Sequence, residues 1–101
     1  MDFFVNAVDF EQSGTGIVCT VSGNLPSPAF KITGRSARLE GPNGPLSIDV
    51  AVAEAPGIWA QKLVRAKEQI TLPNPVPGSR LEYAVHVNGQ LAKAGVATIP
   101  A

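Results

Sequence analysis

Apolar and polar residues alternate along two segments of this chain. Between residues 46 and 53, Leu, Ile and Val alternate with Ser, Asp and Ala, and between residues 81 and 88 apolar residues alternate with Glu, Ala, His and Asn. A period of two is typical of a β-strand that buries one face. Residues 17–21 are rich in β-branched side chains and place Ile17, Cys19 and Val21 on one face. We therefore predict strands over all three segments.

Weaker strand candidates are residues 30–33, 37–40 and 70–72, and residues 3–10 form either a strand or a short helix capped by Asp2. Glycine and proline clusters between these segments cut the chain into pieces of strand length. Asn88-Gly89 suits a type I′ hairpin turn, because both residues tolerate positive φ. Pairing outward from that turn predicts Tyr83 opposite Ala94, with Gly95 marking a bulge.

The segment from residue 57 to residue 69 fits two interpretations. Four apolar residues between Trp59 and Ile70 follow helical spacing, and Pro56 suits a helix start. Against a helix, Ile58 and Val64 lie off that apolar stripe, and two strands interrupted near residues 65–66 suit the surrounding pattern. We predict strand here, with one short helix near residues 57–69 as the alternative.

Seven or eight short strands separated by turns are expected of a β-sandwich. Residues 70–73, followed by the Pro77-Gly78 turn and the strand that contains Tyr83, resemble the E strand, loop and F strand of fibronectin type III and related immunoglobulin-like domains. The resemblance implies an all-β, immunoglobulin-like antiparallel β-sandwich. We expect residues 1–101 to form one domain of this kind, with Tyr83 in its core.

Composition limits the partners of the chain. Hydrophobic residues make up 45% and charged residues 16% of 101 residues, and eight basic residues balance eight acidic ones. Zero net charge provides no attraction for nucleic acid or an anionic membrane, and it favours self-association or a protein partner. The sequence shows no signal peptide and no apolar run long enough to span a membrane, so we expect a soluble chain of unknown compartment.

The residues needed for catalysis or metal binding are few. Cys19 and His86 are the only cysteine and histidine, and the alternation places Cys19 in the core and His86 on a solvent face. Structural zinc requires four Cys or His ligands, and Glu82 and His86 stand about 13 Å apart along one strand. We expect no enzyme, no catalytic, metal or cofactor residues, and no cofactor; the binding residues are unknown.

Three other motifs have simple structural interpretations. Gly14-Thr15-Gly16 lacks the lysine of a phosphate-binding loop and is expected to be a hairpin turn. The proline-rich stretch 73–77 is expected to be a rigid connection rather than a ligand for an aromatic groove. The chain has one basic group, which consists of Lys62, Arg65 and Lys67. We expect these residues to form an ordinary solvent-exposed face rather than an anion-binding site.

Together these observations predict a non-catalytic structural or protein-interaction module. A specific form is a subunit or decoration domain of a larger assembly, such as a virion or surface appendage, that adds through its loops or an edge strand. The alternative is a carbohydrate-binding or enzyme-accessory module, which needs exposed aromatic rings. Trp59 is the candidate ring, because the other aromatic residues are expected in the core: Phe3, Phe4, Phe10, Phe30 and Tyr83.

Overall fold

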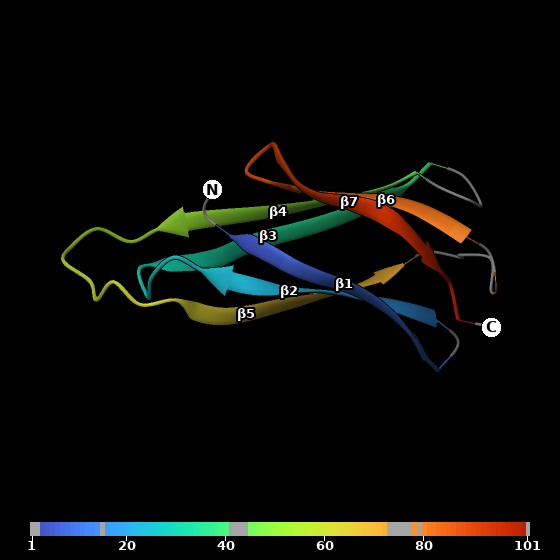
Figure 1. The fold of residues 1–101 in the computed structure, drawn as a ribbon, viewed down its shortest axis with the longest axis horizontal. Helices are drawn as coiled ribbons and strands as arrows, with labels where there is room; N and C mark the ends of the chain where they lie inside the picture. The colour runs from blue at the N-terminus through green and yellow to red at the C-terminus, as the bar shows by residue number, and fades with distance from the viewer. Residues whose placement is uncertain (1–2, 15, 41–44, 73–77, 79, 101) are drawn as a thin grey trace.

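Seven strands form two sheets in the computed structural model, which describes residues 3–14, 16–40, 45–72, 78 and 80–100 (Figure 1). One sheet has the order β1-β2-β5 and the other the order β3-β4-β6-β7. The strands are β1 (Phe4–Ser13), β2 (Gly16–Leu25), β3 (Phe30–Leu39), β4 (Leu46–Glu54), β5 (Val64–Leu72), β6 (Arg80–Val87) and β7 (Gln90–Thr98). The predicted all-β sandwich is confirmed. Within the described part of the chain there is no helix that could cross a membrane.

The core lies between the two sheets and comes mainly from their central strands. Alternate residues of β2, β4 and β6 point inward, as the period of two predicts. The fully or almost fully buried side chains of these strands are Ile17, Cys19, Val21, Leu25, Leu46, Ile48, Val50, Val52, Leu81, Val85 and Val87. One apolar cluster therefore holds the two sheets together.

The ladder between β4 and β6 is parallel, and it runs from Leu46 opposite Tyr83 to Val50 opposite Val87. The immunoglobulin-like resemblance implied antiparallel pairing throughout. That expectation is wrong at the β4–β6 ladder, whereas the other ladders are antiparallel. The β3–β4 hairpin places β4, rather than β3, beside β6. Since β4 buries four large aliphatic side chains and β3 carries Arg35 on its inner face, the more apolar arm occupies the central position.

Three of the four edge strands contain a β-bulge. Asn6 in β1, Thr33 in β3 and Ala92 in β7 are extra residues without a ladder partner. Each bulge moves the inward positions from one parity to the other and increases the local twist. The fourth edge strand, β5, carries Arg65 and Lys67 on its outer face. Bulges and exposed charges both hinder the addition of a further strand to a sheet edge.

The hairpin between β6 and β7 turns at the predicted residues. Asn88 and Gly89 have φ angles of 49° and 83°, and Val87 lies opposite Gln90. The Asn88 side chain also continues the ladder toward β4, because its Oδ1 accepts a hydrogen bond from Val52 N at 2.9 Å and its Nδ2 donates one to Val52 O at 3.1 Å. This turn therefore joins β6 and β7 to the far end of β4.

Beyond that turn, the predicted register is wrong by one residue. The bulge falls at Ala92 rather than at Gly95, so Tyr83 lies opposite Gly95 instead of Ala94. The tyrosine ring needs the space that glycine leaves, since a Cβ atom at position 95 would lie 2.7 Å from Tyr83 Oη. The steric fit between Tyr83 and Gly95 sets this register, and the residues of the turn alone do not predict it.

The segment 57–69 forms neither the short helix nor two strands interrupted near residue 65. Residues 55–63 connect β4 to β5 without regular structure, and β5 then runs unbroken from Val64 to Leu72. Its pairing with β2 provides a full ladder, from Leu25 opposite Val64 to Ile17 opposite Leu72. Figure 1 shows the connection extending beyond the ends of the strands. The helical spacing is therefore overridden by strand pairing.

Candidate functional site

The connection of residues 55–63, here called the β4–β5 loop, exposes three large apolar side chains. Ile58 is fully exposed, Leu63 is 60% exposed and Trp59 is 41% exposed. Near the start of the loop, Gly57 follows Pro56 and turns the backbone with a φ of 119°. Trp59 Nε1 donates a hydrogen bond to Pro56 O at 3.3 Å, which folds the indole back over the turn. Clustered apolar side chains on a surface mark an interaction site.

The β4–β5 loop also carries little charge. Lys62 is its one ionisable residue, and the Lys62 backbone N donates to Ala60 O at 3.0 Å. Covering this loop would therefore desolvate few charged groups, and charged residues are depleted at the centre of protein interfaces.

An apolar hollow of about 370 Å³ lies at the base of this loop, on the side of the sandwich where the edges of β3 and β5 approach each other. The two ends of the loop flank it, because Phe30 in the hollow lies opposite Glu54, and Val64 also lines the hollow. Its lining is Leu25, Pro28, Phe30, Lys31, Ile32, Val64, Ala66, Lys67 and Glu68. A projecting apolar loop and an apolar hollow therefore share one end of the molecule.

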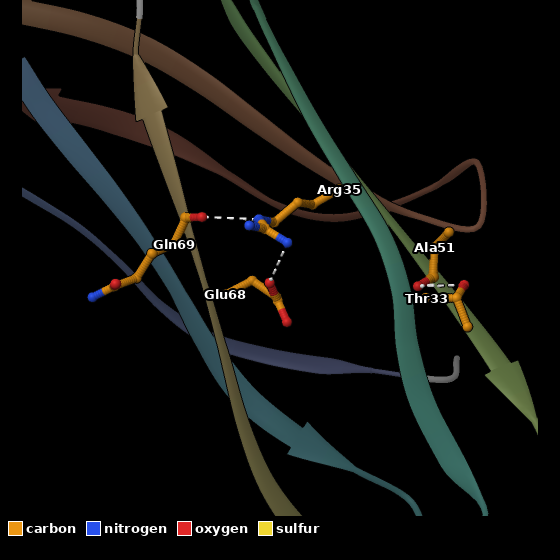
Figure 2. A network of polar contacts seen from close by, with 5 residues as sticks. All are labelled: Thr33, Arg35, Ala51, Glu68 and Gln69. Atoms are coloured by element: carbon orange, nitrogen blue, oxygen red, sulfur yellow. Dashed lines mark hydrogen bonds and ion pairs between the residues drawn. The ribbon is translucent and has the colours of Figure 1, made fainter.

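Further along the same side, Arg35 spans the gap between the sheets (Figure 2). Its Nε donates a hydrogen bond to Gln69 O at 2.9 Å, and its Nη1 lies 3.2 Å from Glu68 Oε2. The bulge at Thr33, whose Oγ1 donates to Ala51 O at 3.3 Å, turns Arg35 toward the other sheet. Because the Arg35 side chain is half exposed, its ion pair contributes little stability, and its main effect is to satisfy an edge carbonyl.

This role of Arg35 was not predicted from the sequence, although the sequence contains a signal for it. Apolar residues of this segment stand at even positions up to Ile32 and at odd positions from Ala37 onward. Such a change of parity within one strand indicates a bulge and reverses the face of every later residue.

A second hollow, of about 520 Å³, lies on the outer face of the β1-β2-β5 sheet and has a polar lining. Two members of the predicted basic group, Arg65 and Lys67, meet there, whereas Lys62 lies in the β4–β5 loop. The complete lining is Asn6, Ser22, Gly23, Asn24, Arg65, Ala66 and Lys67.

Cys19 and His86 lie on different sheets and different faces. Cys19 is fully buried between the sheets, and this burial, with a smaller contribution from the Asp9 carboxylate, raises the pKa of its thiol to about 12. His86 points outward from β6 and lies between Asp49 and Leu91 in the ladder. Among the residues that the structure describes, no three His, Cys, Asp or Glu side chains form a group that could hold a metal ion.

Of the remaining predictions from the sequence, one is confirmed, one is wrong, and one concerns residues that the structure does not describe. Gly14, with a φ of 60°, lies at the predicted hairpin turn between β1 and β2. Phe4 is 43% exposed on the outer face of β1, so its predicted place in the core is wrong, whereas Phe3 is fully buried. Thr15 and the proline-rich stretch 73–77 lie outside the described residues.

Comparisons of the chain with protein-family models, with curated proteins and with solved structures found no match. The function is therefore inferred from the loop and the two hollows.

Proposed function

We propose that this chain is a non-catalytic assembly subunit that binds a second copy of itself through the β4–β5 loop. The observation that carries this proposal is the exposure of Ile58, Trp59 and Leu63 on one short projecting loop with a single charge. Apolar groups exposed in this way gain free energy when another protein covers them.

The free energy available suits a reversible association. Burying a side chain such as Ile58 or Leu63 stabilises a complex by about 1.5–3 kcal/mol, and Trp59 adds to this. Two loops in a dimer therefore supply roughly 6–12 kcal/mol from these aliphatic residues alone, against an association cost of about 4–15 kcal/mol. Because these two ranges overlap, we expect a weak dimer whose dissociation constant is in the micromolar range or above.

A second copy is the proposed occupant because the chain carries both halves of the contact. The apolar hollow at the base of the loop, about 370 Å³, accommodates Ile58. Since loop and hollow share one end of the molecule, two copies related by a twofold axis can each insert a loop into the other, which closes the assembly. Zero net charge does not oppose this contact.

Association through sheet edges is less favourable. Three edge strands are bulged and the fourth exposes Arg65 and Lys67, which all hinder strand addition. Of the two routes expected from the sequence, loops or an edge strand, these features favour the loops.

The wider role that we propose is a subunit or decoration domain of a larger assembly, such as a virion or surface appendage. A fibronectin type III or immunoglobulin-like relationship would suit a module of this size. The β1-β2-β5 neighbour order agrees with the A-B-E order of immunoglobulin sheets, whereas the parallel β4–β6 ladder does not.

Sedimentation velocity over a range of concentrations tests the proposal. Wild type should shift with concentration toward twice the mass of one chain, and the Ile58→Ser/Leu63→Ser variant should remain monomeric. The matched control is Leu91→Ser/Val96→Ser, which removes two exposed apolar residues from β7 and should still dimerise. A wild type that stays monomeric, or a loop variant that dimerises like wild type, would contradict the proposal.

Disulfide trapping tests which surface receives the loop. A mixture of the Ile58→Cys and Lys31→Cys variants should form a mixed disulfide, because Lys31 lines the hollow and Cys19 is buried. Trapping confined to Ile58→Cys with itself would show that the loops contact each other and that the hollow is not the receiving surface.

Carbohydrate binding remains the second candidate function, because Trp59 is exposed, as that function requires. The flanking residues of Trp59, however, are Ile58 and Ala60, which offer no side-chain hydrogen bonds to sugar hydroxyls. The polar hollow on the β1-β2-β5 sheet suits a sugar better.

A further inference from the structure

Two rows of side chains cross the outer face of the β1-β2-β5 sheet at the polar hollow. Phe4, Asn24 and Arg65 are ladder partners in one row. Ser22 and Lys67 are partners in the next row. Directly opposite residues have Cβ atoms about 4.5–5.5 Å apart, so these side chains form one continuous surface.

The bulge in β1 adds another polar group to this surface. Asn6 is the extra residue between Val5 and Ala7, and it lines the hollow. Gly23 makes the bulge possible, because a Cβ atom there would collide with the Phe4 carbonyl oxygen and crowd the Phe3 ring. Bulges often redirect a side chain next to a functional site.

The hollow is positively charged although the chain is neutral. Within the described residues, Arg65 and Lys67 form no ion pair, and no acidic side chain lines the hollow. The adjacent Glu68 points to the inner face and pairs with Arg35. A guanidinium group binds a carboxylate through two parallel hydrogen bonds, so Arg65 with Lys67 is suited to an anion.

We propose that this hollow binds a saccharide that carries a carboxylate, such as a uronic acid residue. Arg65 and Lys67 bind the carboxylate, the amides of Asn6 and Asn24 bind ring hydroxyls, and the exposed Phe4 ring at the end of its row packs against the apolar face of the sugar. A hollow of about 520 Å³ is within the size range of small-molecule sites. Two cations on a neutral chain are too few for a nucleic acid backbone.

This hollow lies on the outer face of the sheet and the β4–β5 loop does not line it, although Ala66 and Lys67 line the apolar hollow as well. The test is an NMR titration of the ¹⁵N-labelled protein with three probes: a glucuronic acid-containing disaccharide, the neutral disaccharide cellobiose, and sodium sulfate. The acidic disaccharide should shift amide resonances of residues 4–7, 22–24 and 65–67. Cellobiose should bind at least about fivefold more weakly, and added salt should weaken the acidic disaccharide.

Variants assign the two parts of the ligand. Arg65→Gln/Lys67→Gln should weaken binding of the acidic disaccharide about tenfold. The matched control, Arg38→Gln/Arg80→Gln, removes the same charge from the other sheet and should leave binding unchanged. Phe4→Ala should weaken binding of the disaccharide but not of sulfate, and circular dichroism verifies that it folds.

Four results would overturn the proposal. These are an absence of shifts in the three segments, equal binding of cellobiose, sulfate binding as tight as that of the acidic disaccharide, and equal loss of affinity in the control variant.

Discussion

Replacing Gly95 by alanine should destabilise the protein through the phenol of Tyr83. A Cβ atom at position 95 would lie 2.7 Å from Tyr83 Oη and 3.0 Å from Cζ. The ring has limited freedom to move away, since it packs against Phe10 with ring centroids 6.0 Å apart. Gly95 is not among the described residues with positive φ, so the cost of alanine there is steric rather than conformational.

Two opposing effects set the magnitude. Forcing an extra methyl group into a packed site costs about 1–3 kcal/mol, while replacing glycine restricts the unfolded chain and returns about 0.4–1 kcal/mol. We expect Gly95→Ala to lower the free energy of unfolding by about 1–2 kcal/mol. Ala94→Leu is the matched control, because Ala94 is exposed opposite Ala84 and should change stability by less than about 0.5 kcal/mol.

Urea denaturation distinguishes the two variants. With a slope of about 1 kcal/mol per M, Gly95→Ala should lower the midpoint by about 1–2 M and Ala94→Leu by less than about 0.5 M. Adding Tyr83→Phe to Gly95→Ala removes the nearest atom and should recover part of the loss, which a double-mutant cycle measures. The opposite order, with Ala94→Leu the more damaging change, would refute the register and return Ala94 to the position facing Tyr83.

Three further predictions concern the core and the turn. The pKa of the Cys19 thiol is raised from 9.0 to about 12 in the folded protein, so the unfolded chain loses this proton first as pH rises. The free energy of unfolding should therefore fall between about pH 9 and 12, and it should fall less steeply in Cys19→Ala. Urea denaturation over this pH range measures the difference. The same thiol should react slowly with a thiol reagent at neutral pH, and prompt modification would show that it is accessible. Asn88→Gly keeps a residue suited to positive φ but loses both hydrogen bonds to Val52, so it should cost about 1–2 kcal/mol in urea denaturation; an unchanged midpoint would show that these bonds add no stability.

Local sequence determined the strands with clear alternation and the turn between β6 and β7. The alternation from Leu46 to Val52 and the turn at Asn88 and Gly89 are properties of an extended chain and of backbone sterics, so they can be predicted without knowledge of any partner strand. The burial of Cys19 followed from the same alternation.

The candidate sites could be predicted only in part. Composition identified Trp59 as the candidate aromatic ring for binding a carbohydrate. The spacing of the basic residues identified Arg65 and Lys67 as members of one basic group. Their setting depends on strand pairing: Asn6 and Ser22 reach the basic group only through the β1-β2-β5 ladders and the bulge.

Tertiary structure alone decided the order of the strands, the register beyond the bulges and the fate of residues 55–63. The β3–β4 hairpin could have placed either arm beside β6, and burial of the more apolar β4 selected the parallel ladder. Likewise, the space needed by Tyr83 selected Gly95 as its partner. These choices depend on free energies of packing between residues far apart in the chain, which a pattern read along the chain does not contain.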